Sequence, residues 1–175
     1  MSADVNAQKD CRNRLMKSFD STLSLPVQLR ALLEGERDWL ANAANTVALI
    51  HAGVPRLNWA GFYFLRGGEL VLGPFIGAPA CVRIASGRGV CGTAIRQRRT
   101  LVVPDVQAFP GHIACDAATR SEIVVPLLKA GRLLGVLDLD SPDLARFGAI
   151  QAEIEELAAI YLEASDFSCL VPGEE

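Results

Sequence analysis

Two pairs of apolar segments, each joined by a tight turn, constrain the fold of this 175-residue chain more than any other feature. Residues 58–65 and 70–75 flank a turn that contains Gly67 and Gly68, and residues 121–128 and 133–140 flank a turn that contains Gly131. Apolar or aromatic segments separated by a short glycine-containing turn are typical of β-hairpins. The sequence therefore predicts an antiparallel sheet built around two hairpins.

Helical spacing of apolar residues appears before, between and after these hairpins. The predicted helices cover residues 26–35, 36–52, 90–98 and 147–162. A short buried strand is expected at 101–103, and loops are expected at 77–89 and 104–119. Helices combined with antiparallel strands are typical of the α+β class. We expect helices to pack on one face of the sheet and loops to cover a ligand pocket on the other.

The length of the chain suits one domain of ordinary size. We assign residues 25–167 to this domain, residues 1–24 to an N-terminal arm or weak helix, and residues 168–175 to a mobile tail.

Charge and cysteine content narrow the class of protein. The net charge of −3 gives no sign of the clustered positive charge that nucleic-acid binding requires. No apolar run approaches the ~20 residues that span a bilayer, and the N-terminus lacks the features of a signal peptide. Five cysteines follow no compact disulfide framework, so some thiols should be free. We expect a cytoplasmic protein that binds neither nucleic acid nor membrane.

Three acids are expected to meet on one face of the sheet. Asp138 and Asp140 alternate with apolar residues, so both point to the same side of their strand, and Glu122 begins the neighbouring strand. One alternative is that this face is exposed to water, which by itself would explain why the strand carries two aspartates. Three neighbouring carboxylates would instead form a receptor for an ammonium group. They would also raise at least one pKa, so that one acid stays protonated and can donate a proton.

Two aromatic residues, Trp59 and Tyr63, share a strand face with Gly61 between them. The glycine is expected to leave a gap in which a small apolar or cationic group can sit. The alternative is that both rings belong to the core.

Cys115 is the candidate nucleophile. It lies in a long loop, three residues after His112, which can assist its ionisation, and directly before Asp116, which opposes ionisation. Cys81 lies in a glycine-rich segment expected to be a loop, and Cys91 lies in a second glycine-rich segment, at the start of the helix predicted over 90–98. Both thiols are expected to be accessible. A sulfenic acid on Cys115 can condense with a second thiol to form a disulfide, so either of these cysteines is a candidate resolving thiol.

A structural role in the core is an alternative for any one of these cysteines. A zinc site is another alternative, because three cysteines and a histidine are suitable ligands, although the short spacing of most structural zinc sites is missing. Its ligands would be Cys81, Cys91, His112 and Cys115. The other two cysteines lie near the chain ends and are expected to be bystanders: Cys11 and Cys169.

Six segments together resemble the free methionine-(R)-sulfoxide reductases, a family of enzymes built on a GAF domain. These segments are residues 58–63, 87–94, 103–106, 109–116, 121–126 and 135–142. The resemblance extends from about Leu29 to the closing helix. It implies a GAF fold and the thiol-dependent reduction of free L-methionine-(R)-sulfoxide to L-methionine, with no metal or organic cofactor.

The resemblance also implies roles for the candidate residues. Cys115 matches the attacking cysteine, Cys81 the usual resolving cysteine, and Cys91 a third cysteine that can enter disulfide exchange. Glu122 would donate a proton. The implied substrate-binding residues are Trp59, Tyr63, Glu122, Asp138 and Asp140. Thioredoxin would reduce the disulfide, and a homodimer is expected because GAF domains often pair through their flanking helices.

A function of another class is the main alternative. GAF domains often act as small-molecule sensors, so the pocket would then bind a regulatory ligand and the cysteines would only report redox state. The combination of three acids with a full set of cysteines favours the enzyme.

Overall fold

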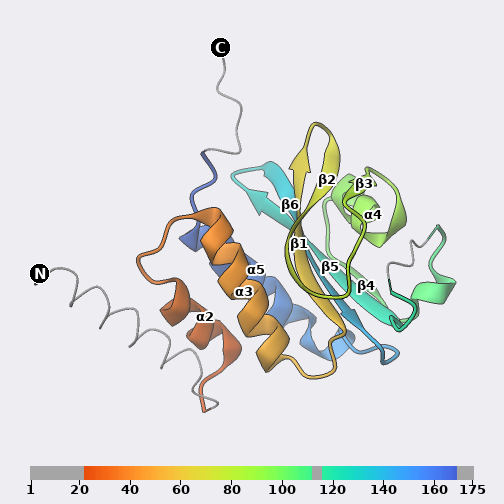
Figure 1. The fold of residues 1–175 in the computed structure, drawn as a ribbon, viewed down its shortest axis with the longest axis horizontal. Helices are drawn as coiled ribbons and strands as arrows, with labels where there is room; N and C mark the ends of the chain where they lie inside the picture. Colours follow the sequence, from red (N-terminus) through yellow and green to blue (C-terminus); the bar gives the residue numbers. More distant parts are fainter. Residues whose placement is uncertain (1–21, 112–115, 169–175) are drawn as a thin grey trace, which may run out of the picture.

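The computed structural model describes residues 22–111 and 116–168, and its centre is a curled antiparallel sheet (Figure 1). Six strands lie in the order β3-β2-β1-β6-β5-β4, and every neighbouring pair is antiparallel. The strands are β1 (Trp59–Arg66), β2 (Glu69–Gly77), β3 (Arg83–Ala85), β4 (Leu101–Val103), β5 (Ser121–Lys129) and β6 (Arg132–Ser141). The two predicted hairpins, β1-β2 and β5-β6, are confirmed.

Within residues 22–111 and 116–168, four α-helices surround the sheet. They are α2 (Leu25–Leu33), α3 (Trp39–Gly53), α4 (Gly89–Gln97) and α5 (Gln151–Ala164). Helices α3 and α5 cover one face and α2 packs against them, whereas α4 packs on the other face (Figure 1). The predicted α+β class, with helices packed on one face, is confirmed, and α4 joins the expected loops on the pocket face. No helix in the described part of the chain is long and apolar enough to cross a membrane.

Helix starts follow from local chemistry. Pro26 lies in the first turn of α2, where its missing N–H removes no hydrogen bond. The side chain of Asp38 caps α3 by accepting hydrogen bonds from the backbone N–H groups of Leu40 and Ala41, at 2.9 and 2.8 Å. The α3 helix therefore begins at Trp39 rather than at the predicted Glu36.

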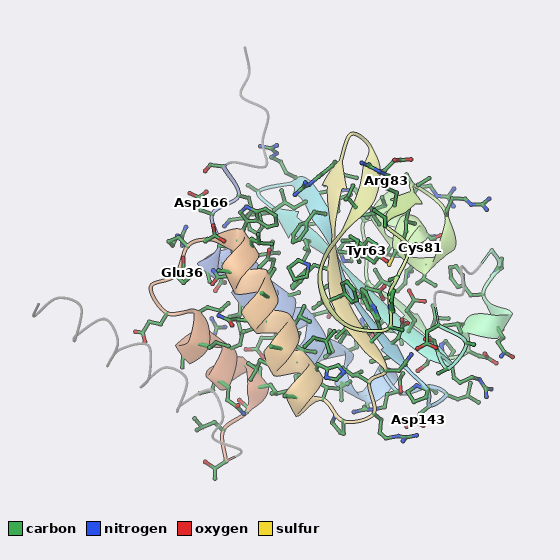
Figure 2. The ribbon with its side chains drawn as sticks, viewed as in Figure 1. Glu36, Tyr63, Cys81, Arg83, Asp143 and Asp166 are labelled. Carbon is green, nitrogen blue, oxygen red and sulfur yellow. The ribbon has the colours of Figure 1, made fainter. Side chains whose placement is uncertain are left out.

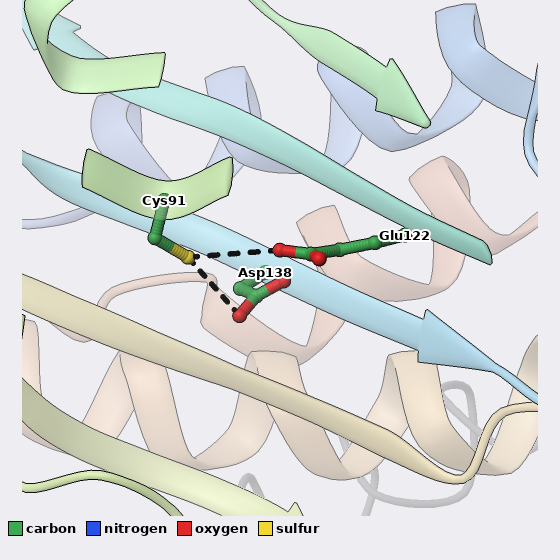
Figure 3. A group of neighbouring side chains, drawn as sticks. All are labelled: Cys91, Glu122 and Asp138. Carbon is green, nitrogen blue, oxygen red and sulfur yellow. Dashed lines mark hydrogen bonds between the residues drawn. The ribbon is translucent and has the colours of Figure 1, made fainter. Parts of the chain in front are cut away.

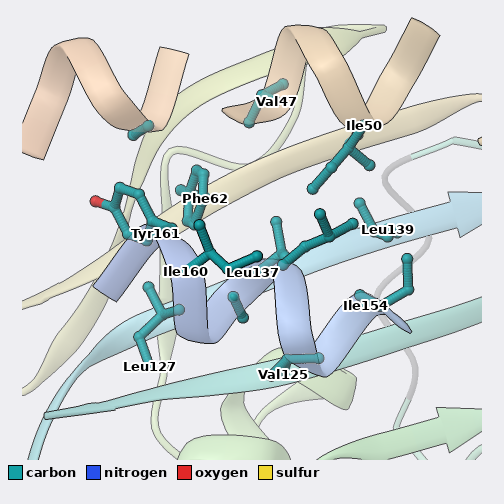
Figure 4. Close-up of a cluster of buried hydrophobic side chains, with 14 of the residues drawn as sticks. Val47, Ile50, Phe62, Val125, Leu127, Leu137, Leu139, Ile154, Ile160 and Tyr161 are labelled. Carbon is teal, nitrogen blue, oxygen red and sulfur yellow. The ribbon is translucent and has the colours of Figure 1, made fainter. Parts of the chain in front are cut away.

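Alternation along β6 divides its side chains between two apolar clusters. Leu137 and Leu139 are fully buried on the helix side, where they join Ile154 and Tyr161 of α5 (Figure 4). Val136 is buried on the opposite side. A shift of one residue in strand register would turn Asp138 toward the helices and remove the leucines from that core. The apolar pattern thus fixes which side chains face the pocket.

Three short elements differ from the prediction. Strand β3 lies within a segment expected to be a loop, and a 3-10 helix, η1 (Val106–Ala108), lies within another. A second 3-10 helix, η2 (Gly148–Ile150), precedes α5, which begins four residues later than predicted. Elements of three residues are too short to show a period in the sequence.

The domain limits stay predictions. Residues 1–21 of the expected arm and residues 169–175 of the expected tail lie outside the described residues.

Candidate active site

Strand register brings the three predicted acids together on the face opposite α3 and α5. Asp140 of β6 pairs with Trp59 on one side and with Glu122 on the other. The next row on this face pairs Gly61 with Asp138. Residues paired across neighbouring strands point to the same side of the sheet. The proximity expected from sequence alternation is therefore present.

Trp59 and Tyr63 form an aromatic wall beside these acids. Their rings stack with centroids 6.0 Å apart, and Phe75 of β2 stacks on Trp59 at 5.5 Å. A Cβ atom at Gly61 would overlap both the Trp59 ring and Phe75. The predicted ligand gap above Gly61 is therefore wrong, because the indole already fills it. Both wall residues are buried in the second apolar cluster, and both also line a pocket.

The polar ends of this wall hold the segment that covers the pocket. The indole Nε1 of Trp59 donates a hydrogen bond to the carbonyl oxygen of Ala78 at 3.1 Å. The hydroxyl of Tyr63 donates to the carbonyl oxygen of Cys81, also at 3.1 Å. Figure 2 shows Tyr63 and Cys81 close together on the side of the sheet away from α3. Cys81 is half-buried, and its position is tied to the aromatic wall.

Cys91 lies in the first turn of α4, the helix predicted over 90–98, and it is buried, so the prediction that its thiol is accessible is wrong. Apolar neighbours in α4 pack this turn against the sheet. The thiol of Cys91 donates to Asp138 Oδ2 at 3.2 Å and lies 4.0 Å from Glu122 Oε1 (Figure 3). Burial, together with the charges of Asp138 and Glu122, raises the pKa of Cys91 well above its usual value. Cys91 is therefore held as a neutral thiol.

The three acids share a raised affinity for protons. Burial raises the pKa of Glu122 well above its usual value, and the charges of Asp138 and Asp140 raise it further. Burial also raises the pKa of Asp138 to about 7, although the hydrogen bond from Cys91 opposes this change. Asp140 is half-buried, and its pKa is raised by burial and by Asp138. The prediction that at least one acid stays protonated near neutral pH follows from these shifts.

A hydrogen-bonded trio borders the pocket beside Asp140. The side-chain amide of Asn58 donates to Asp116 Oδ2 and to Thr119 Oγ1, each at 2.9 Å. The backbone N–H of Ala118 donates to the other Asp116 oxygen at 2.8 Å. These bonds, first that from Ala118, lower the pKa of Asp116. Asp116 is thus an anchored carboxylate, and it directly follows Cys115 in the sequence.

The pocket enclosed by these groups has a cavity volume of about 40 Å³. Its described lining comprises Trp59, Tyr63, Ala78, Pro79, Ala80, Ile84, Arg88, Gly89, Val90, Cys91, Asp116, Thr119, Glu122, Asp138 and Asp140. This volume holds only a few water molecules. A narrow pocket with an aromatic wall and an acidic floor suits a slender cationic ligand.

Known proteins share this architecture. Residues 29–164 match the GAF domain family. A free methionine-R-sulfoxide reductase of Escherichia coli is 54% identical over 117 residues, which are 67% of this chain and 71% of that protein. The chain belongs to the GAF-domain family of free methionine-R-sulfoxide reductases. This assignment confirms the resemblance and the GAF fold that the sequence suggested.

Two solved structures show how closely the fold is matched. The X-ray structure of a free methionine-R-sulfoxide reductase from Neisseria meningitidis, in complex with its substrate, is 46% identical. Its TM-score is 0.76, over 79% of this chain and 84% of that one. The crystal structure of a proposed GAF sensor protein from Burkholderia vietnamiensis is 56% identical, with a TM-score of 0.79 over 85% of this chain and 95% of that one.

Within this family frame, several predicted residues lie outside the described part of the chain: His112, Cys115, Cys11 and Cys169. Their roles stay predictions. Among the residues that the structure describes, the group with metal-ligand geometry is Cys91 with Glu122 and Asp138. It does not include Cys81, so the four-ligand zinc alternative gains no support.

Three residues that contribute to the site were assigned no role from the sequence. Asn58 and Thr119 acquire their place through contacts across about sixty residues. Arg88 lines the pocket just before α4, and the sequence assigned no role to it although it lies in segment 87–94 of the resemblance. Only the folded arrangement shows that these polar groups border the acids.

Proposed function

We propose that this protein reduces free L-methionine-(R)-sulfoxide to L-methionine through thiol chemistry in the pocket beside Trp59, Glu122 and Asp138. The observation that carries this proposal is the burial of Glu122 and Asp138 beside an aromatic wall in a chain of this reductase family. Such a pocket complements a ligand with an ammonium group at one end and a methyl sulfoxide at the other. The relatives named above supply the reaction class.

In this proposal, Asp138 and Asp140 bind the substrate ammonium group. A bound cation favours the charged form of a carboxylate, so it offsets part of the burial that raises the pKa of Asp138. Arg88 lies at the start of α4 and is available to the substrate carboxylate. The methyl group packs on Trp59 and Tyr63. A methionine sulfoxide inside a peptide has no ammonium charge on that residue, so the acids favour the free amino acid.

The reactive step assigns Cys115 as nucleophile and Glu122 as acid. The Cys115 thiolate attacks the sulfoxide sulfur while protonated Glu122 gives its proton to the sulfoxide oxygen. The oxygen passes to Cys115 and the original sulfur–oxygen bond breaks. Methionine is released, and Cys115 is left as a sulfenic acid. The raised pKa of Glu122 supports its role, because the acid must hold a proton near neutral pH. Asp116, which directly follows Cys115 in the sequence, is anchored at the pocket.

Cys81 is the better resolving thiol of the two that the structure describes. Cys91 is buried, donates its proton to Asp138 and has a raised pKa, so it is a poor nucleophile in this conformation. Cys81 is half-buried in the segment that covers the pocket. Condensation of its thiol with the Cys115 sulfenic acid releases water and forms a disulfide.

A dithiol partner must then reduce this disulfide by exchange, and we assign that step to thioredoxin. A reducing cytoplasm, the location expected from the cysteine content, suits such a cycle. The homodimer expected from the sequence also belongs to the proposal, and light scattering of the purified protein would measure it.

The test is NADPH consumption in an assay coupled to thioredoxin and thioredoxin reductase. Each diastereomer of free methionine sulfoxide and a peptide-bound form are supplied separately, with Cys115→Ser as the inactive variant and Cys169→Ser as a matched cysteine control. We expect turnover of the free R form alone, lost in Cys115→Ser and kept in Cys169→Ser. Asp140→Asn should raise KM by roughly tenfold, the effect of losing ~1.4 kcal/mol of binding.

Absence of turnover by fully reduced protein would contradict the proposal. Binding of methionine sulfoxide or methionine without turnover would then favour the sensor alternative. An unchanged KM in Asp140→Asn would remove only the assignment of the ammonium site.

A further inference from the structure

We propose that Cys91, Glu122 and Asp138 form a binding site for a thiophilic divalent cation such as Zn²⁺ or Cd²⁺, and that the bound ion blocks the substrate pocket. This site differs from a cofactor site, because the proposed reductase chemistry needs no metal. Binding of the ion is independent of the proposed reaction, whereas inhibition by the ion rests on that proposed function.

The spacing of the donor atoms matches a tetrahedral site. Bonds of ~2.3 Å from zinc to sulfur and ~2.1 Å to oxygen, at a tetrahedral angle, place sulfur and oxygen about 3.6 Å apart. Cys91 Sγ lies 3.2 Å from Asp138 Oδ2 and 4.0 Å from Glu122 Oε1, on either side of that value. One donor atom from each of the three residues lies within 4.8 Å of the others. Small side-chain adjustments would therefore complete three corners of a tetrahedron, with a fourth corner for water.

An unpartnered oxygen points independently to a ligand. Asp138 is only 7% exposed, yet its Oδ1 atom has no hydrogen-bond partner in the described part of the chain. A buried carboxylate oxygen without a partner is costly, and a cation beside it removes that cost. Figure 3 shows the sulfur of Cys91 joined by dashed lines to both Asp138 and Glu122, so an ion among these donor atoms meets all three side chains. The three residues also line the same pocket.

The donor set selects the kind of ion. A thiolate is a soft ligand and favours zinc and cadmium over magnesium and calcium, which prefer oxygen ligands alone. Carboxylates from two neighbouring strands supply charge that a divalent ion neutralises. The site differs from the zinc site considered from the sequence, because carboxylates stand in place of His112 and the other cysteines.

Occupation of this site would remove two groups from the proposed reaction. Glu122 bound to the ion cannot hold the proton that it gives to the sulfoxide. Asp138 bound to the ion no longer attracts the substrate ammonium group, and the positive ion repels it. We therefore expect inhibition that is competitive with methionine sulfoxide.

Direct binding is tested with Cd²⁺, which gives an ultraviolet charge-transfer band when a thiolate binds it. The parent for this test carries serine at Cys11, Cys115 and Cys169, so that only Cys81 and Cys91 remain. Cys91→Ser should abolish the band, whereas Cys81→Ser, the matched control, should keep it. Glu122→Gln should weaken Cd²⁺ binding by roughly 100-fold or more, since loss of a supporting residue alone costs ~10–100-fold.

The absence of any band, a band that persists in Cys91→Ser, or equal loss in Cys81→Ser would overturn the site. Thermal melting of each metal-free variant identifies misfolding. If Cys91→Ser fails to fold, Glu122→Gln and Asp138→Asn carry the test, and unchanged Cd²⁺ affinity in both would overturn the site. The metal-free native chain is assayed first for reductase activity, so failure of the proposed function is separate from failure of the site. In active enzyme, Zn²⁺ inhibition that excess substrate does not relieve would overturn the blocking step.

Discussion

Replacing Asp138 with asparagine should stabilise the fold at pH 8 while impairing substrate binding. Burial raises the pKa of Asp138 from its usual 3.8 to about 7, so between these pH values folding requires the carboxyl to take up a proton. Stability contributed by such a group is present at low pH and is lost as the pH rises through this window, by ~1.4 kcal/mol per pH unit. The total loss is about 4 kcal/mol, of which about 3 kcal/mol falls between pH 5 and pH 8.

The assay is urea unfolding of the native chain and of Asp138→Asn at pH 5 and at pH 8. A neutral amide has no proton to lose, so the free energy of unfolding of the variant relative to the parent should rise by about 3 kcal/mol between the two pH values. The same variant should show a higher KM for methionine sulfoxide. This combination identifies Asp138 as a residue that serves binding at the expense of stability.

A matched control is Asp143→Asn. Asp143 accepts two hydrogen bonds from Arg56, at 2.8 and 2.6 Å, and its pKa is lowered chiefly by this contact. Stability from a lowered pKa is present above the usual value of 3.8 and is lost only below it, so this variant should lose the same small amount at pH 5 and pH 8. A pH-independent effect of Asp138→Asn, or a larger destabilisation at pH 8, would refute the burial argument.

Three further predictions concern the pocket. Gly61→Ala should lower the free energy of unfolding by ~1–3 kcal/mol and change the fluorescence emission of Trp59, because the added methyl group overlaps the indole ring. Urea unfolding followed by fluorescence measures both effects. Tyr63→Phe should lower the free energy of unfolding by ~1 kcal/mol and speed the alkylation of Cys81, because the tyrosine hydroxyl no longer bonds to the carbonyl oxygen of Cys81. An unchanged alkylation rate would contradict this prediction. A pH–rate profile of kcat/KM should fall on the alkaline side as Glu122 loses its proton, and Glu122→Gln should lower the rate by roughly 100-fold and remove that fall.

The sequence predicted the parts of the fold that depend on local periodicity. Alternation along β6 correctly separated Leu137 and Leu139 from Asp138, and the glycine-containing turns correctly identified both hairpins. These patterns carry information because a strand with one buried face tolerates only one register. The proximity of Glu122 to Asp140 followed from the same hairpin.

Other features depend on packing between distant segments and had no local pattern. Gly61 predicted an open space between Trp59 and Tyr63, but the indole of Trp59 lies across Gly61 and fills that space. The glycine-rich setting of Cys91 suggested an accessible thiol, whereas apolar contacts of the surrounding helical turn bury it. The bond from Asn58 to Asp116 joins segments 58 residues apart, so neither residue alone reveals the contact.

Strand β6 carries both a buried acid that destabilises the fold and leucines that stabilise it. On the helix side of β6, Leu137 and Leu139 are fully buried, and each contributes ~1.5–3 kcal/mol. On the pocket side, the buried charge of Asp138 costs about 4 kcal/mol above pH 7, so the two leucines offset one acid. Because their side chains point to opposite faces, truncation of a leucine should lower stability at every pH, whereas neutralising Asp138 changes stability only above pH 3.8. The strand can therefore hold destabilising, functional groups on one face without losing its register, and this separation lets a small GAF domain keep several buried acids in its pocket.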